Sequence, residues 1–187
     1  MNLNQLTSLL LVLVCLFSCK NKYDLSVSEV EFLIKETDEM HESDQRIRHE
    51  FIKLDVYYGV DLESNGSFLS FKDKKEILGK EYAEYRRKGD SLRDVMHSID
   101  EVNTKKLLAL IRKYGFPSKE RLGTYHASAY FIFVHSDRQY FDEIRILIEQ
   151  EYAAKRISEY ERAYIFWHLD GRNGMMPSVN EDGSVNY

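Results

Sequence analysis

The chain has very little proline and cysteine, with two of each among its 187 residues. Because proline removes a backbone donor and clashes with the preceding helical turn, its scarcity leaves long stretches free to form helices. Positive charge is also in deficit, since 26 Lys and Arg face 31 Asp and Glu, for a formal net charge of -5. That balance argues against nucleic-acid binding, which needs a basic surface to displace the counterions of phosphate.

Catalytic and metal-binding signatures are missing as well. The sequence contains no glycine-rich phosphate loop, no Gly-x-Ser-x-Gly elbow and no His-Glu-x-x-His run. His41 and His49 would stand about 12 Å apart along a helix, which is too far for both to bind one ion. The sequence therefore predicts neither a metal nor a cofactor.

The longest apolar run, residues 9–17, is uncharged but only about half the roughly 20 residues that a membrane-spanning helix needs. It is typical of the core of a signal peptide. The Leu-Phe-Ser-Cys that ends at Cys19 resembles the lipobox of bacterial lipoproteins, in which the cysteine carries the lipid. We therefore predict a signal peptide over 1–18, a lipid anchor such as palmitate on Cys19 and a polar tether over 19–24. The protein would then be a membrane-anchored lipoprotein of a bacterial cell envelope.

The rest of the chain repeats apolar residues at helical spacing, which predicts an all-α fold. We expect one compact domain of about five to seven helices over residues 25–174. An irregular loop near 59–71 and an extended or frayed tail over 175–187 should lie outside the helices.

Start and stop signals divide this domain into helices. Capping boxes of the form Ser-x-x-Glu, beginning at Ser28 and Ser158, are expected to open the first and last helices. Among the glycines, Gly89 is expected to interrupt one helix and Gly115 to stop the next. The stretch 124–134 is apolar nearly all round and predicts the central helix of the packing.

The first helix carries one polar violation of its apolar face. Asp44 falls on the seam that runs from Leu33 to Leu54, so a carboxylate is expected on or beside the buried side. Arg48 stands one turn later, in the favourable acid-before-base order, and Gln45 adds amide donors. These residues predict either a semi-buried ion pair that fixes helix packing or part of an active site.

Two helix ends carry further candidates. His135 closes the most apolar helix, where it can interact with the helix C-terminus or act as a general base. Asp170 and Arg172 follow the last helix and predict either a C-cap or part of a site. The catalytic candidates are Asp44, His135 and Asp170, and the binding candidates are Gln45, Arg48 and Arg172.

These polar residues belong to short motifs that follow one another along the chain. The motifs are Asp44-Gln45-x-x-Arg48, Ile99-Asp100-x-x-Asn103, Tyr114-Gly115-Phe116-Pro117, Leu122-Gly123, Val134-His135-Ser136-Asp137 and Asp170-x-Arg172. Their order resembles the bacterial domain of unknown function 6624 family over most of the chain after the leader, and the tail departs from the pattern. The resemblance implies no activity or cofactor. It implies instead that the six candidate residues are the polar members of a shared pattern. If these residues meet in one cleft, they would form an acid/base site in which arginine holds an anion.

Three classes of function are compatible with these features. Because no reaction signature is present, we expect a tethered binding or interaction module that presents a cleft to a peptide, glycan or protein partner. A hydrolase-like or transferase-like enzyme would instead use His135 or Asp44 as general base, with an arginine holding an anionic group. A structural or inhibitory lipoprotein is the third. A perturbed titratable cluster in an open pocket would favour the enzyme, and a broad apolar patch without one would favour the binding module.

Overall fold

The computed structural model describes residues 24–62, 68–123 and 129–186, and it confirms the predicted all-α fold. The α-helices are α2 (Val27–Tyr57), α3 (Phe71–Leu78), α4 (Tyr82–Tyr114), α5 (Lys119–Leu122), α6 (Ala129–Val134), α7 (Phe141–Ala153) and α8 (Glu159–Leu169). The short 3-10 helices η1 (Gly79–Glu81) and η2 (Arg138–Tyr140) lead into α4 and α7. Near the C-terminus, β1 (Ser178–Val179) and β2 (Val185–Asn186) form an antiparallel pair.

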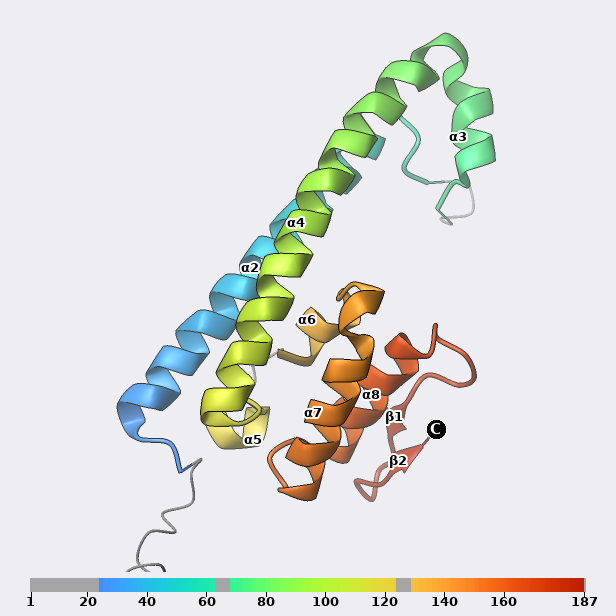
Figure 1. Cartoon of the computed structure of the whole chain (residues 1–187). Coiled ribbons are helices and arrows are strands. Elements are labelled where there is room, and N and C mark those ends of the chain that lie inside the picture. The colour runs from blue at the N-terminus through green and yellow to red at the C-terminus, as the bar shows by residue number, and fades with distance from the viewer. Residues whose placement is uncertain (1–23, 63–67, 124–128, 187) are drawn as a thin grey trace, which may run out of the picture.

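The two longest helices, α2 and α4, run antiparallel side by side (Figure 1). With 31 and 33 residues they extend roughly 45 to 50 Å at 1.5 Å per residue. At one end α3 folds back beside the pair, and at the other end α5, α6, α7 and α8 gather (Figure 1). We call residues 51–62 and 68–96 the arm, and the remaining described residues the body.

Serine-based capping boxes set the starts of the first and last helices. The box at Ser158 is confirmed, because its side chain accepts a hydrogen bond from the backbone of Glu161 and the Glu161 carboxylate accepts one in return. The box predicted at Ser28 is wrong, since the N-cap of α2 is Ser26 and its partner is Glu29. The sequence offers Ser-x-x-Glu in both positions, and the earlier one gives the longer helix with more backbone hydrogen bonds.

The interruption predicted at Gly89 is also wrong, because α4 runs unbroken through it. Gly89 faces α2, where an added Cβ would meet the Leu54 side chain at 3.7 Å. The break comes earlier, at Gly79, whose φ of +51° lies in the left-handed region that glycine enters without a steric penalty. Gly89, which packs against α2, therefore stays helical. Gly79 ends α3 after eight residues.

The hydrophobic core lies in the body, where α6 packs against α2, α4 and α8. The predicted central helix is confirmed over residues 129–134, and residues 124–128 of that prediction lie outside the described residues. Helix α7 pairs with α8 (Figure 1), and Arg112 of α4 forms an ion pair with Glu143 of α7. The largest fully buried apolar side chains of the body are Phe116, Phe133, Leu33, Met40, Leu107, Leu108, Ile111, Ile144, Ile148 and Ile165, and Val60 is fully buried in the arm.

The end of α4 is fixed by a buried carboxylate. As predicted, α4 stops at Gly115, which has a φ of +77°. The next backbone N–H, that of Phe116, donates to Glu151 of α7 at 2.7 Å, and Arg156 donates to the same carboxylate at 2.6 and 2.8 Å. Because Glu151 is only 2% exposed, this contact ties the turn after α4 firmly to α7.

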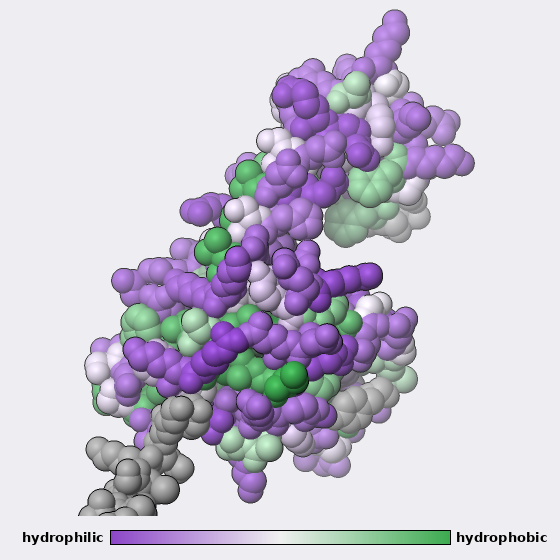
Figure 2. All heavy atoms as spheres, viewed as in Figure 1, coloured by the Kyte–Doolittle hydropathy of each residue, from purple (hydrophilic) through white to green (hydrophobic). Residues whose placement is uncertain are grey.

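The predicted irregular regions are confirmed in outline. In the loop expected near 59–71, Leu62 and Phe68 form an isolated antiparallel bridge, and residues 63–67 lie outside the described ones. The tail expected to be extended carries the β1–β2 hairpin. Figure 2 shows a mainly hydrophilic surface on the arm, with apolar side chains gathered on the body. None of the described helices combines the length and apolar composition needed to cross a membrane.

Candidate functional site

Asp44 of α2 and His135, at the end of α6, meet in the body. The Oδ1 atom of Asp44 lies 2.9 Å from Nδ1 of His135 and 2.8 Å from a guanidinium nitrogen of Arg48. Its Oδ2 atom accepts a hydrogen bond from the Gln45 side chain at 2.8 Å. The Asp44 side chain is only 2% exposed, which confirms the prediction of a carboxylate on the buried face. Four of the six candidates thus form one polar group.

A second buried carboxylate, Asp100 of α4, completes this group. Arg48 donates to both Asp100 oxygens at 3.2 Å, so its guanidinium bridges the carboxylates of Asp44 and Asp100. Asp100 was not among the predicted site residues, although it stands one turn before Thr104 and two turns before Leu107 on the buried seam of α4. We call Asp44, Gln45, Arg48, Asp100 and His135 together the Asp44 cluster.

Burial acts on both carboxylates of the Asp44 cluster, with opposite net results. Burial by itself would raise the pKa of Asp44, but the hydrogen bond and charge of His135 and the charge of Arg48 outweigh it and leave that pKa lowered. For Asp100, burial dominates over the compensating contacts with Arg48, so the pKa of Asp100 is raised. Asp44 is therefore the carboxylate held in its ionised form beside His135.

The body surface next to the Asp44 cluster opens into a cleft of about 380 Å³, which we call the body cleft. Four predicted residues line it, namely Gln45, Arg48, His135 and Arg172. Most of the remaining wall comes from the rings of α6 and α8, which are Phe131, Tyr164, Trp167 and His168. The cleft therefore combines cationic donors with flat apolar surfaces, a composition typical of small-molecule sites.

The end of α8 separates the last two candidates. The N–H of Gly171 donates to the His168 carbonyl and that of Arg172 to the Trp167 carbonyl, the two bonds of a Schellman motif. Arg172 has a φ of +62°, a conformation that costs energy for a residue with a side chain. That turn places Arg172 on the body cleft. Asp170 instead caps α8, and its side chain pairs with Arg145 at 2.6 Å on the exposed surface, so it is not part of the site.

His168 adds a second imidazole to the wall of the body cleft. Its Nδ1 lies 3.0 Å from the Tyr164 carbonyl, and its ring packs 4.6 Å from the Tyr164 ring and 4.8 Å from the Trp167 ring. Burial lowers the pKa of His168 despite the hydrogen bond to Tyr164, and the positive charges of Arg172 and His135 lower it further. His168 is thus a neutral imidazole at neutral pH.

The Asp44–His135 pair has the geometry of a carboxylate that orients an imidazole. Because Nδ1 of His135 is bonded to Asp44, Nε2 is the ring nitrogen left for a ligand in the body cleft. In the imidazolium form Nε2 can donate a hydrogen bond to an anion, and in the neutral form with the proton on Nδ1 it can take a proton from water. Among the described residues that line the cleft, none is a serine, threonine or cysteine, so these residues offer no such nucleophile for covalent catalysis.

The same cluster has ligand atoms spaced for a metal ion. One atom each from Asp44, Asp100 and His135 lie within 4.8 Å of one another. Arg48, however, is already bonded to both carboxylates and supplies the positive charge that a metal would bring. A cation would have to displace the Arg48 guanidinium from two partners to bind there.

Comparisons with known proteins found no matching family model, no matching curated protein and no matching solved structure. The resemblance described above therefore stays a prediction. The predicted signal peptide and Cys19 lie within residues 1–23, outside the described residues.

Proposed function

We propose that the protein is an envelope binding module whose body cleft holds a ligand with a carboxylate or a similar anionic group. The observation that supports it most is the convergence of Arg172 and His135 beside the rings of Tyr164 and Trp167 in one cleft. Arginine binds carboxylates through two parallel donors, and aromatic rings bury large apolar area at low entropic cost.

The anion would lie between the Arg172 guanidinium and Nε2 of His135. Asp44 contributes indirectly, because it fixes the ring of His135 and is itself held by Arg48. The flat part of the ligand would pack on Trp167 and Tyr164. C-terminal carboxylates of peptides and acidic sugars both have this chemistry, and we propose that lipidated Cys19 keeps the module at the membrane of a bacterial envelope where such ligands occur.

A titration of the full-length chain tests this function. Trp167 is the single tryptophan, so its fluorescence reports on the cleft directly. The probes are N-acetyl-dialanine and glucuronate, each paired with its uncharged counterpart, the dipeptide amide and glucose. We expect at least one of the two acids to change the Trp167 emission, and which acid does so distinguishes a peptide ligand from a sugar ligand. The uncharged counterpart of that acid should bind at least about tenfold more weakly.

A matched pair of variants assigns the signal to the cleft. Arg172→Gln should raise the Kd of the acid by about tenfold or more, because it removes a charge-assisted hydrogen bond. Arg87→Gln, an exposed arginine on the arm, should leave the Kd unchanged. If neither acid binds, or if Arg172→Gln binds as tightly as the wild type, the proposed function is wrong.

The Asp44–His135 pair favours hydrolysis as a second candidate. In that case His135 would act as general base on a water molecule, with Asp44 orienting the ring. Incubating the chain with a ligand identified in the titration and following its NMR spectrum tests this alternative. If the wild type converts the ligand and His135→Gln binds the ligand without converting it, the protein is an enzyme. If the ligand stays unchanged, the protein only binds it.

A further inference from the structure

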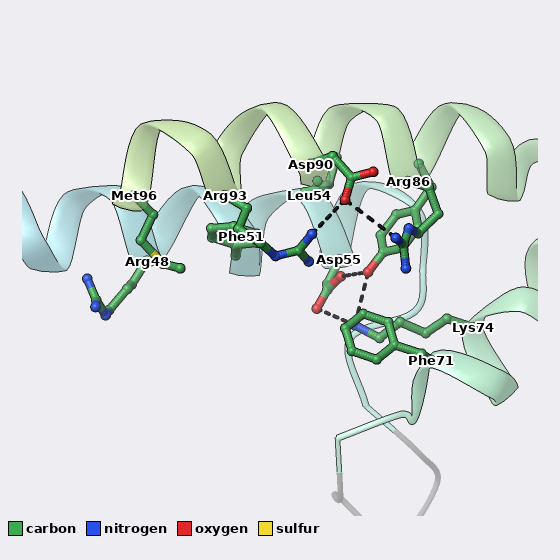
Figure 3. A pocket seen from close by; sticks show the side chains of 12 residues that line it. Arg48, Phe51, Leu54, Asp55, Phe71, Lys74, Arg86, Asp90, Arg93 and Met96 are labelled. Atoms are coloured by element: carbon green, nitrogen blue, oxygen red, sulfur yellow. Dashed lines mark hydrogen bonds and ion pairs between the residues drawn. The ribbon is translucent and has the colours of Figure 1, made fainter. Parts of the chain in front are cut away.

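A second, partly open cavity lies in the arm and is lined by residues of α2, α3 and α4 (Figure 3). We call it the arm cavity. Its volume is about 400 Å³, within the range of roughly 300 to 1,000 Å³ that small-molecule sites occupy. Apolar side chains from all three helices line it, namely Phe51, Leu54, Phe71 and Met96. Arg48 is the one residue found in the linings of both the arm cavity and the body cleft.

Two arginines of α4 give the arm cavity an excess of positive charge. Arg86 and Arg93 both point toward Asp90 (Figure 3), and its Oδ1 atom lies 2.6 Å from Arg93 and 3.6 Å from Arg86. One carboxylate oxygen thus serves two guanidinium groups, and the two side chains keep 43% and 38% of their surface exposed. Within the described lining of the arm cavity, these two guanidinium groups thus share one carboxylate beside an apolar wall.

The other charged groups of the arm cavity are engaged in structural contacts. Lys74 of α3 lies 2.6 Å from Asp55, and the Tyr85 hydroxyl donates to the same carboxylate at 2.8 Å. Burial lowers the pKa of Lys74, but the hydrogen bonds with Asp55 and Tyr85 outweigh it, so that pKa is raised and the ion pair is intact. These contacts hold α3, and with it Phe71, against the long helices.

Arg48, at the opposite end of the cavity from Lys74 (Figure 3), is also committed, because it bridges Asp44 and Asp100. Recognition of a ligand charge in the arm cavity therefore depends on Arg86 and Arg93. Each guanidinium carries several donors in a planar fork, and a single shared carboxylate oxygen uses few of them.

We propose that the arm cavity is a second ligand site, for a small amphipathic anion. The anionic group binds between Arg86 and Arg93, and the apolar part packs against Phe51, Phe71 and Met96. This site is separate from the body cleft, since the arginines and apolar residues that would recognise the ligand do not line that cleft. The proposal therefore does not depend on the function proposed above.

Methionine methyl NMR of the full-length chain locates a ligand in either site. Met96 lines the arm cavity, Met176 lines the body cleft, and Met40 is buried in the core as a reference. The probe is octanoate, and octanol and octylammonium are its neutral and cationic counterparts. We expect octanoate to shift the Met96 methyl signal while Met40 and Met176 stay in place, and octanol and octylammonium to bind several-fold more weakly.

Arginine variants then test the recognition itself. The double variant Arg86→Gln/Arg93→Gln should raise the Kd of octanoate by about tenfold or more, since it removes the charge-assisted donors. Arg87→Gln, the neighbouring arginine on the same helix, should change it by less than about twofold, because Arg87 does not line the arm cavity. If the double variant loses its native Met40 signal, the two single variants are titrated in its place by the same criterion. The proposal is overturned if Met96 does not respond, if octylammonium binds equally well, or if the glutamine variants bind octanoate like the wild type.

Discussion

Replacing Asp44 by Asn tests the physical account of the Asp44 cluster most sharply. The amide keeps the shape of the side chain and removes its negative charge. Arg48 and His135 then lose the ionised acceptor that lies 2.8 and 2.9 Å from them. Breaking a buried charge pair by removing one partner typically costs about 3 to 5 kcal/mol. Because Arg48 keeps its second partner, Asp100, we expect the lower end of that range, about 3 kcal/mol of unfolding free energy.

Asp100→Asn is the matched control, since it neutralises the other carboxylate on the same guanidinium. Asp100 receives only the Arg48 bonds at 3.2 Å, and burial raises its pKa. Its ionised form is therefore less well stabilised at neutral pH, and an amide avoids that penalty. We expect Asp100→Asn to lower the unfolding free energy by about 1 kcal/mol or less, which is the net contribution of an ordinary hydrogen bond.

The two variants should also differ in the sign of their pH dependence. The lowered pKa of Asp44 contributes stability above the unfolded-state pKa, near 3.9, and that contribution is lost as the pH falls through the folded-state pKa. The difference in unfolding free energy between the wild type and Asp44→Asn should therefore decrease below about pH 4. The raised pKa of Asp100 acts oppositely, so the wild type should gain stability relative to Asp100→Asn as the pH falls.

Urea unfolding followed by Trp167 fluorescence measures both gaps, with far-UV circular dichroism as a second probe of the helices. The comparison is made at pH 7 and again between pH 3 and 5. A loss in Asp100→Asn equal to or larger than that in Asp44→Asn would refute the assignment of Asp44 as the ionised centre of the cluster.

Further predictions concern other parts of the molecule and use the same unfolding assay. Gly89→Ala should raise the unfolding free energy by about 0.5 to 1 kcal/mol, because Gly89 is inside α4 and the new methyl group meets Leu54 at an ordinary contact distance; a loss would contradict the continuous helix. Glu151→Gln should lower the unfolding free energy by about 3 kcal/mol, since the buried carboxylate accepts from the Phe116 N–H and pairs with Arg156. An unchanged unfolding free energy would mean that this contact is dispensable. Zinc ions should not raise the unfolding midpoint, because Arg48 is bonded to both carboxylates, whereas a rise would show that a metal displaces it.

The sequence predicted the helices well where local signals agree with packing. The periodic seam of α2 and the capping box at Ser158 each act over a few residues, and the structure confirms both. Glycine was a weaker guide, because its effect depends on what it faces. Gly89 packs on α2 and stays helical, while Gly79, which has nothing within 4 Å of an added Cβ, turns the chain.

The candidate site was predictable only in part, because it is assembled across helices. The violation at Asp44 and its pairing with Arg48 one turn later follow from the geometry of a single helix. The contacts of His135 and Asp100 with these residues depend on how α6 and α4 cross α2, which no local pattern specifies. At the end of α8, the turn at Gly171 places Arg172 on the body cleft, whereas Asp170 pairs with Arg145 on the exposed surface.

The proposed function requires an anion to bind in the body cleft against the imidazole that Asp44 orients. The most direct test is to label histidine with ¹⁵N and follow the His135 ring nitrogens while N-acetyl-dialanine or glucuronate is added at neutral pH. We expect the Nε2 resonance of His135 to shift as the acid binds, following the Kd measured by Trp167 fluorescence, while Nδ1 stays bonded to Asp44. An unchanged Nε2 signal at concentrations that saturate the fluorescence would contradict it.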